Sequence, residues 1–112
     1  MLGFKPMTLA TAALFAVALF SFEVAAQPRH AGDPEHGLDL AKRWCASCHV
    51  VSADQTQANA DVPPFATIAK IPDFSADRLA QFLLNPHPKM PELPLSRAAA
   101  DDLTAYILSL NK

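Results

Sequence analysis

The segment Cys45-Ala46-Ser47-Cys48-His49 constrains the fold of this 112-residue chain more than any other feature. Two thiols lie about one helical turn apart, and an imidazole directly follows the second thiol. This spacing lets both sulfurs reach the two vinyl groups on one edge of a porphyrin and leaves His49 beneath its iron. C-x-x-C-H is the attachment sequence of c-type haem. The motif therefore predicts one haem held covalently by Cys45 and Cys48, with His49 as an axial ligand of the iron.

Three other interpretations of the two cysteines agree less well with the rest of the sequence. A thioredoxin-type redox pair would lie beside a strand–helix–strand pattern, which the sequence lacks. A zinc site needs four ligands, and neither a second C-x-x-C nor an H-x-x-x-H pair is present. A disulfide between Cys45 and Cys48 would close a very short loop and would stabilise the chain little.

Residues 1–26 are expected to form a secretory signal peptide, which leaves residues 27–112 as a single folded domain. Lys5 precedes an apolar run over Met7–Phe22, and Val24-Ala25-Ala26 supplies the small residues of a cleavage site. The alternative is an uncleaved membrane anchor, but the run is shorter than the roughly 20 residues that span a bilayer. We therefore expect a periplasmic protein, exported to the compartment where haem-attachment machinery acts in bacteria.

Length and charge narrow the class of protein further. A domain this short buries little apolar surface, so a haem at its centre would supply core that the chain lacks. The 9 basic and 11 acidic residues give a net charge of -2. This balance gives no indication of a nucleic-acid partner, which would require a clustered basic face.

The hydrophobic pattern predicts an all-α domain of three or four helices. Pro34 can occupy the first turn of a helix over Pro34–Trp44, in which Leu38, Ala41 and Trp44 recur at helical spacing. Ser75 is expected to cap a helix over Ala76–Leu84, and Ser96 one over Arg97–Leu110. A short helical turn is expected within Pro64–Ile71. The aromatic side chains are expected to pack in the core, namely Trp44, Phe65, Phe74, Phe82 and Tyr106.

Met90 is the predicted second axial ligand of the iron. It is the only methionine after residue 26, and it lies between Pro88 and Pro91 in a polar loop, away from any apolar helix face. Prolines restrict the unfolded chain, so less entropy is lost when such a loop is held in place. His/Met pairs occur in electron-carrying cytochromes and raise the reduction potential. His87, three residues earlier, is the competing ligand, whereas His30 and His36 are expected to be surface histidines.

An iron-binding histidine commonly donates its other ring N–H to a carbonyl, which fixes the ring. Pro63 or Pro64 would supply that carbonyl, because a proline restrains the backbone there.

Together these features resemble the class I monohaem cytochromes c, above all the small periplasmic ones of bacteria, over Pro34–Leu110. Gly37 is similar to the family's helix-crossing glycine, and Leu103-Thr104-Ala105-Tyr106-Ile107 to its C-terminal helix motif. The sequence departs from the family at Ala41, where an aromatic is usual. The resemblance implies a cytochrome c fold wrapped around one haem and an aromatic that crosses near Gly37. It also implies His/Met ligation through His49 and Met90, and a carbonyl from Pro63 on the axial histidine.

The expected function is that of a periplasmic electron carrier, not an enzyme. Its partners would be redox proteins that donate and accept single electrons, with transient docking on a membrane complex among them. Lys42, Arg43 and Lys89 would attract an acidic partner, although surface charges are more often only solvated. Two alternatives stay open: a subunit of a larger dehydrogenase or oxidase, and a haem peroxidase or gas-binding protein with a labile sixth ligand.

Overall fold

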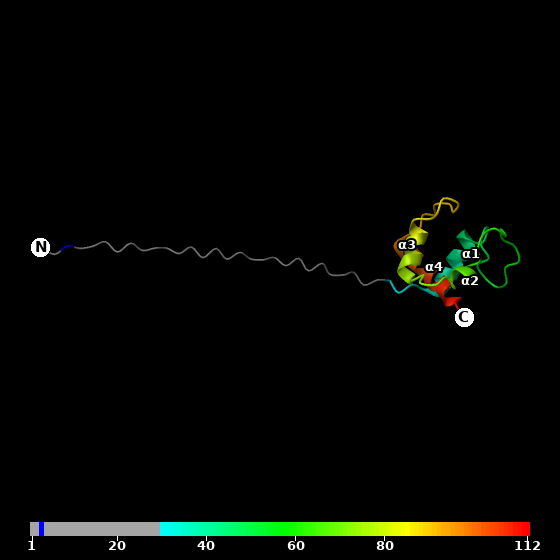
Figure 1. Ribbon diagram of the computed structural model, residues 1–112, viewed down its shortest axis with the longest axis horizontal. Coiled ribbons are helices and arrows are strands. Elements are labelled where there is room, and N and C mark those ends of the chain that lie inside the picture. The colour runs from blue at the N-terminus through cyan, green and yellow to red at the C-terminus, as the bar shows by residue number, and fades with distance from the viewer. Residues whose placement is uncertain (1–2, 4–29) are drawn as a thin grey trace.

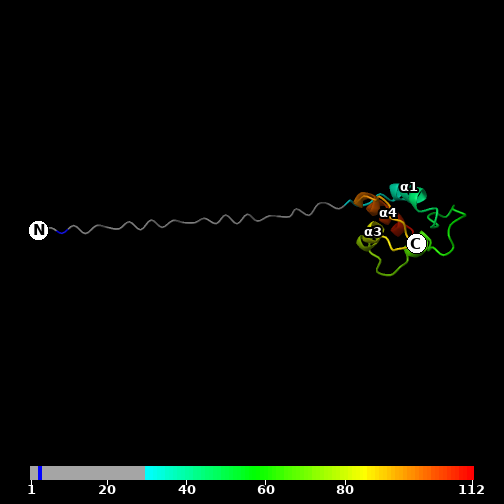
Figure 2. The same cartoon turned by 90° about the horizontal axis from the view of Figure 1, so that it is seen from above.

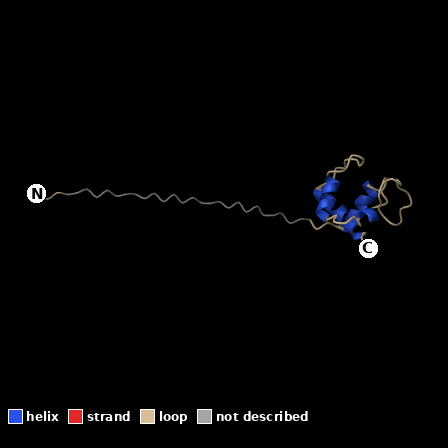
Figure 3. Ribbon diagram, viewed as in Figure 1, coloured by secondary structure: helices blue, strands red, loops and turns tan. Residues whose placement is uncertain are grey.

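The computed structural model describes Gly3 and residues 30–112, and residues 30–112 form helices and loops without a strand (Figure 3). Four helices follow one another in this part of the chain: α1 (Pro34–Trp44), α2 (Phe65–Ile68), α3 (Ala76–Leu84) and α4 (Arg97–Ser109). The prediction of an all-α domain is confirmed. Helices α1 and α3 have the predicted bounds, and α4 ends one residue earlier than predicted. Apart from Gly3, the signal peptide expected over residues 1–26 lies outside the described residues.

The helices begin at polar capping residues. Ser75 and Ser96 each accept a hydrogen bond from the backbone N–H three residues later, at 3.3 and 3.1 Å, as predicted. Helix α1 is capped by Asp33, whose carboxylate accepts from the backbone N–H groups of Glu35 and His36 at 2.9 and 3.3 Å. Such acceptors satisfy N–H groups that have no partner within the helix. Short-range chemistry therefore fixes where each of the three longer helices starts.

Helix α4 lies at the centre of the fold, between α1 and α3 (Figures 1 and 2). It contacts α1, α3 and α2, while α1 and α3 do not contact one another within the described residues. No helix within residues 30–112 has the length and apolar composition needed to cross a membrane.

Helices α1 and α4 meet at Gly37. A Cβ atom added to Gly37 would collide with the backbone carbonyl of Asp102 and would lie 2.8 Å from the Cβ of Tyr106. Only a residue without a side chain allows the two backbones to approach so closely. The expected crossing of an aromatic near this glycine is confirmed, and it accounts for a glycine inside a helix, where it costs about 1 kcal/mol relative to alanine.

The buried carboxylate of Asp102 fastens the chain before α1 to the middle of α4. Its two oxygens contact His30 Nε2 at 2.7 Å and His36 Nδ1 at 2.6 Å, and Oδ1 accepts from the backbone N–H of Asp33 at 2.7 Å. Asp102 is only 4% exposed. The expectation that His30 and His36 are surface histidines is thus incomplete: their rings are about half exposed, but each is paired with this carboxylate.

Most apolar side chains pack as expected, with two exceptions among the aromatic residues. Phe65 and Tyr106 are buried and Phe74 is half-buried, but Trp44 and Phe82 are each 41% exposed. The prediction of core packing is wrong for Trp44 and Phe82, because the helical period does not tell which face of a short helix meets its neighbour. The core residues are Ala41, Cys45, Val51, Phe65, Ala69, Leu79, Ala80, Leu83, Ala100, Leu103, Tyr106 and Ile107.

Candidate haem site

The C-x-x-C-H segment forms a helical turn that continues from the end of α1. The backbone N–H of Cys45 donates to the carbonyl of Ala41 at 2.9 Å. The N–H groups of Cys48 and His49 then both donate to the carbonyl of Cys45, at 3.1 and 2.8 Å. This turn brings the two cysteines and the histidine close together, as the spacing predicts.

The two cysteines differ in their surroundings, and neither forms a disulfide. Cys45 is 5% exposed, whereas Cys48 is exposed. Burial, together with the nearby thiol of Cys48, raises the pKa of the Cys45 thiol to about 11. The Cys45 side of the site therefore lies inside the protein, and the Cys48 side faces solvent.

The ring of His49 is held by a hydrogen bond to the backbone of Pro63. Its Nδ1 lies 2.7 Å from the Pro63 carbonyl oxygen. A carbonyl only accepts hydrogen bonds, so Nδ1 carries the proton and Nε2 keeps its lone pair. The ring also packs against Phe65, with centroids 5.2 Å apart. His49 thus presents the nitrogen that a metal ion would bind, in one fixed orientation.

An apolar cavity lies beside His49, between the end of α1 and the inner face of α3. It contains about 630 Å³ free of protein atoms, part of which is open to solvent. Phe82, which is exposed on α3, lines this space together with Ile71, which is 49% exposed. The lining residues are Cys45, His49, Pro63, Phe65, Ile68, Ile71, Phe74, Leu79, Phe82, Leu83, His87, Met90 and Ile107.

Met90 and His87 both reach this cavity from the proline-rich loop after α3. Met90 is half-buried and packs against the core, and its backbone N–H donates to the His87 carbonyl at 2.9 Å. His87 is exposed, and its ring lies 5.5 Å from the ring of Phe82. The loop therefore brings both candidate ligands to the cavity that His49 also lines.

The residues around this cavity fit a covalently attached haem. The apolar lining suits a porphyrin ring, and the Cys45 thiol, the His49 imidazole and the Met90 thioether belong to the same lining. Trp44 lies outside the lining.

Comparison with known proteins agrees with this geometry. Over 80 residues the chain is 65% identical to cytochrome c-552 of Bradyrhizobium diazoefficiens, an alignment that covers 71% of this chain and 77% of that relative. The chain belongs to the monohaem c-type cytochromes. Membership of this family means that the cytochrome carries covalently bound haem c with its iron and serves in electron transport. Neither a protein-family model nor a solved structure matches the chain.

Two polar residues of this cytochrome were not anticipated from its sequence. Gln55, in the loop between α1 and α2, donates hydrogen bonds to the carbonyls of Ala46 and His49 in the C-x-x-C-H segment. Asp102 pairs with His30 and His36. A polar residue in a polar loop and an acidic residue in a helix carry no sequence signal of such contacts, because their partners are fixed only by the fold.

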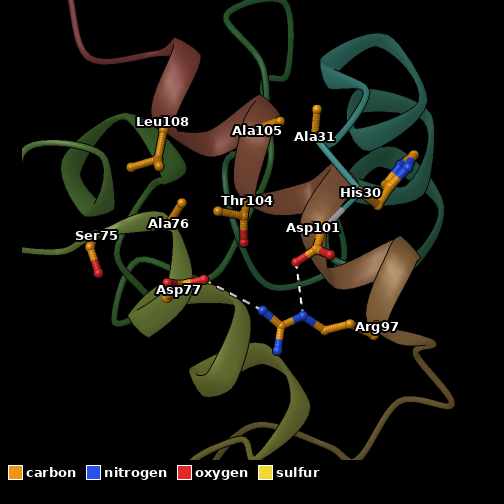
Figure 4. A pocket seen from close by; sticks show the side chains of 10 residues that line it. All are labelled: His30, Ala31, Ser75, Ala76, Asp77, Arg97, Asp101, Thr104, Ala105 and Leu108. Atoms are coloured by element: carbon orange, nitrogen blue, oxygen red, sulfur yellow. Dashed lines mark hydrogen bonds and ion pairs between the residues drawn. The ribbon is translucent and has the colours of Figure 1, made fainter. Parts of the chain in front are cut away.

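A second cavity of the cytochrome, with about 820 Å³ free of protein atoms and partly open to solvent, lies on another face of α4 (Figure 4). There Arg97 bridges two carboxylates, with its Nε 3.0 Å from Asp101 and its Nη2 3.6 Å from Asp77. Asp77 lies in the first turn of α3, so this bridge connects α3 to α4. The charged groups around this second cavity pair with one another, and we assign them a structural role.

Proposed function

We propose that this protein is a periplasmic carrier of single electrons, with thioether bonds from Cys45 and Cys48 and with His49 and Met90 as the axial ligands of the haem iron. One observation carries the proposal: His49 and Met90 line the same apolar cavity, and Pro63 already occupies the other ring nitrogen of His49. When bound, the haem accepts one electron from a donor protein and passes it to an acceptor.

The chain's own residues would keep structural changes small when the haem gains or loses an electron. Pro63 fixes the ring of His49, and the proline-rich loop restrains Met90, so both ligands can stay in place in either oxidation state. The apolar walls would limit the access of water to a bound iron, which together with a methionine ligand would favour a raised reduction potential. Among the described residues that line the cavity, His87 is the one that could act as an acid or base besides the proposed ligand His49.

Electrons would enter and leave at the exposed edge near Cys48. Cys48 is exposed while Cys45 is buried, so a redox partner can approach the C-x-x-C-H turn from the side of Cys48. Lys42, Arg43 and Lys89 are also exposed and would add attraction towards an acidic partner. The partners would be soluble or membrane-bound redox proteins, and haem-attachment machinery would load the protein after export.

Two variants of the holoprotein distinguish the ligands. We expect ferric wild-type protein to show the Met-to-iron charge-transfer band and ferrous protein to bind carbon monoxide slowly. Met90→Leu should remove the band, lower the potential and speed carbon monoxide binding, whereas the control His87→Asn should keep all three wild-type values.

If the wild-type ferric protein lacked the charge-transfer band, and His87→Asn rather than Met90→Leu sped carbon monoxide binding, the sixth ligand would be His87, which lines the same cavity. Rapid carbon monoxide binding by the wild-type protein would instead support the gas-binding or peroxidase alternative and contradict the proposal.

A further inference from the structure

The side chain of Gln55 is tied to four backbone groups around the attachment turn. Its Nε2 donates to the carbonyls of Ala46 at 2.9 Å, His49 at 2.8 Å and Gln57 at 2.7 Å. Its Oε1 accepts from the backbone N–H of Val51 at 2.9 Å. This one amide lies in the loop between α1 and α2, which is drawn in green in Figure 1. It links Ala46, His49 and Val51 to Gln57, which follows them in the same loop.

These partners fix which way the amide points. Val51 offers a donor, and the three carbonyls only accept, so the oxygen must face Val51 and the NH₂ group must face the carbonyls. Two N–H hydrogens then serve three acceptors, one of them in a shared bond. A carboxylate at this position would keep the bond to Val51 and would set a negative oxygen against three carbonyl oxygens.

The neighbouring carbonyls are held by other parts of the fold. The backbone N–H of Asn59 donates to Cys48 at 3.1 Å, and that of Phe65 donates to Val50 at 3.0 Å. The hydroxyl of Tyr106 donates to the carbonyl of Val51 at 2.5 Å. Gln55 adds hydrogen bonds to the carbonyls of Ala46 and His49.

From this pattern we infer that Gln55 is a positioning residue for His49, a role that rests on the proposed ligation of iron by His49. Pro63 holds the imidazole ring, and Gln55 holds the backbone from which the ring extends. With its ring and backbone both restrained, His49 has little freedom to rotate or tilt. The plane of the imidazole relative to the haem, and with it the spin distribution over the porphyrin, would then depend on an amide that touches neither the haem nor the ring.

The first test uses the wild-type holoprotein in its reduced, diamagnetic state. The side-chain NH₂ protons of Gln55 should exchange with solvent at least about tenfold more slowly than those of exposed Gln57, because they are held by hydrogen bonds. Equal exchange rates at the two residues would overturn the inference. This measurement does not depend on whether Met90 or His87 is the sixth ligand, so its failure is separate from a failure of the proposed function.

The second test compares Gln55→Glu with the matched control Gln57→Glu, which makes the same change in the same loop. Gln55→Glu should alter the hyperfine-shifted haem methyl resonances of the ferric protein and shift its midpoint potential, with the helical circular dichroism retained. Gln57→Glu should keep the wild-type resonances. Gln55→Ala, which removes the donors without adding charge, should move the resonances as well. Wild-type resonances in both Gln55 variants would show that His49 is positioned without this amide.

If Gln55→Glu fails to retain haem, the Gln55→Ala spectrum and the wild-type exchange rates decide the outcome. A purely structural role would lower stability in Gln55→Ala and leave its haem methyl shifts unchanged.

Discussion

Gly37 of α1 lies directly against the backbone carbonyl of Asp102 in α4, with no room for a side chain between them. This contact sets how closely the two helices approach. The same approach brings Tyr106 across α1 and places its hydroxyl on the carbonyl of Val51, in the loop that follows the attachment turn. The helix crossing and the position of His49 are therefore parts of one arrangement.

Replacing Gly37 with alanine should lower the free energy of unfolding of the holoprotein by about 1–3 kcal/mol, because the added methyl group would force α1 away from α4. Urea unfolding followed by haem absorbance measures the change. Asp39→Ala, at an exposed position of the same helix, is the control and should change the free energy of unfolding by less than about 0.5 kcal/mol. Equal stability of Gly37→Ala and wild type would contradict the close crossing.

Tyr106→Phe should cost about 1–3 kcal/mol, since it leaves the buried carbonyl of Val51 without its hydrogen bond. Thermal unfolding would report the loss. Ser109→Ala removes a hydroxyl bonded to the Tyr106 carbonyl near the exposed end of α4, and it should have a smaller effect. If the two variants lost the same stability, the buried hydrogen bond of Tyr106 would contribute no more than the partly buried one of Ser109.

The stability of the protein should fall in acid partly through Asp102. Burial alone would raise the pKa of this carboxyl, but hydrogen bonds from the Asp33 N–H, His36 and His30 outweigh burial and lower its pKa below the ordinary value of 3.8. A lowered folded-state pKa stabilises the protein above the ordinary pKa, and this stabilisation is lost as pH falls through the folded-state value.

Asp102→Asn should therefore be less stable than wild type at pH 7 by about 1–3 kcal/mol, and the difference should shrink as pH falls below about 4. Urea unfolding at a series of pH values measures this narrowing. Asp39→Asn, at an exposed site on α1, should follow the wild-type pH profile. A constant difference between Asp102→Asn and wild type at every pH would refute the assignment.

The exported protein should have the mass of residues 27–112 plus one haem, with the haem retained after denaturation. Cleavage after Ala26 is expected because Val24-Ala25-Ala26 supplies small residues at the required spacing. Electrospray mass spectrometry of protein expressed with haem-attachment machinery measures both quantities. A mass that includes residues 1–26 would favour an anchored subunit of a larger complex, and a haem lost in acidified acetone would contradict thioether attachment.

The sequence by itself determined the features that depend on neighbouring residues. The spacing of Cys45, Cys48 and His49 predicts haem attachment because the whole motif fits within one helical turn. Ser75 and Ser96 predict where α3 and α4 start, because a cap acts over only three residues. Family resemblance added the crossing at Gly37 and the carbonyl of Pro63, which the structure places 2.7 Å from His49.

Only the tertiary structure decided what depends on distant parts of the chain. The pairing of Asp102 with His36 and His30 joins residues 66 and 72 positions apart. Phe82 lines the cavity beside His49, although its helical pattern suggested the core. Gln55 likewise has no distinguishing feature in the sequence, and only the fold places three backbone carbonyls around its amide. The physical reason is common to all three: a polar or aromatic side chain has several acceptable environments, and the packing of α1 and α3 against α4 selects one of them.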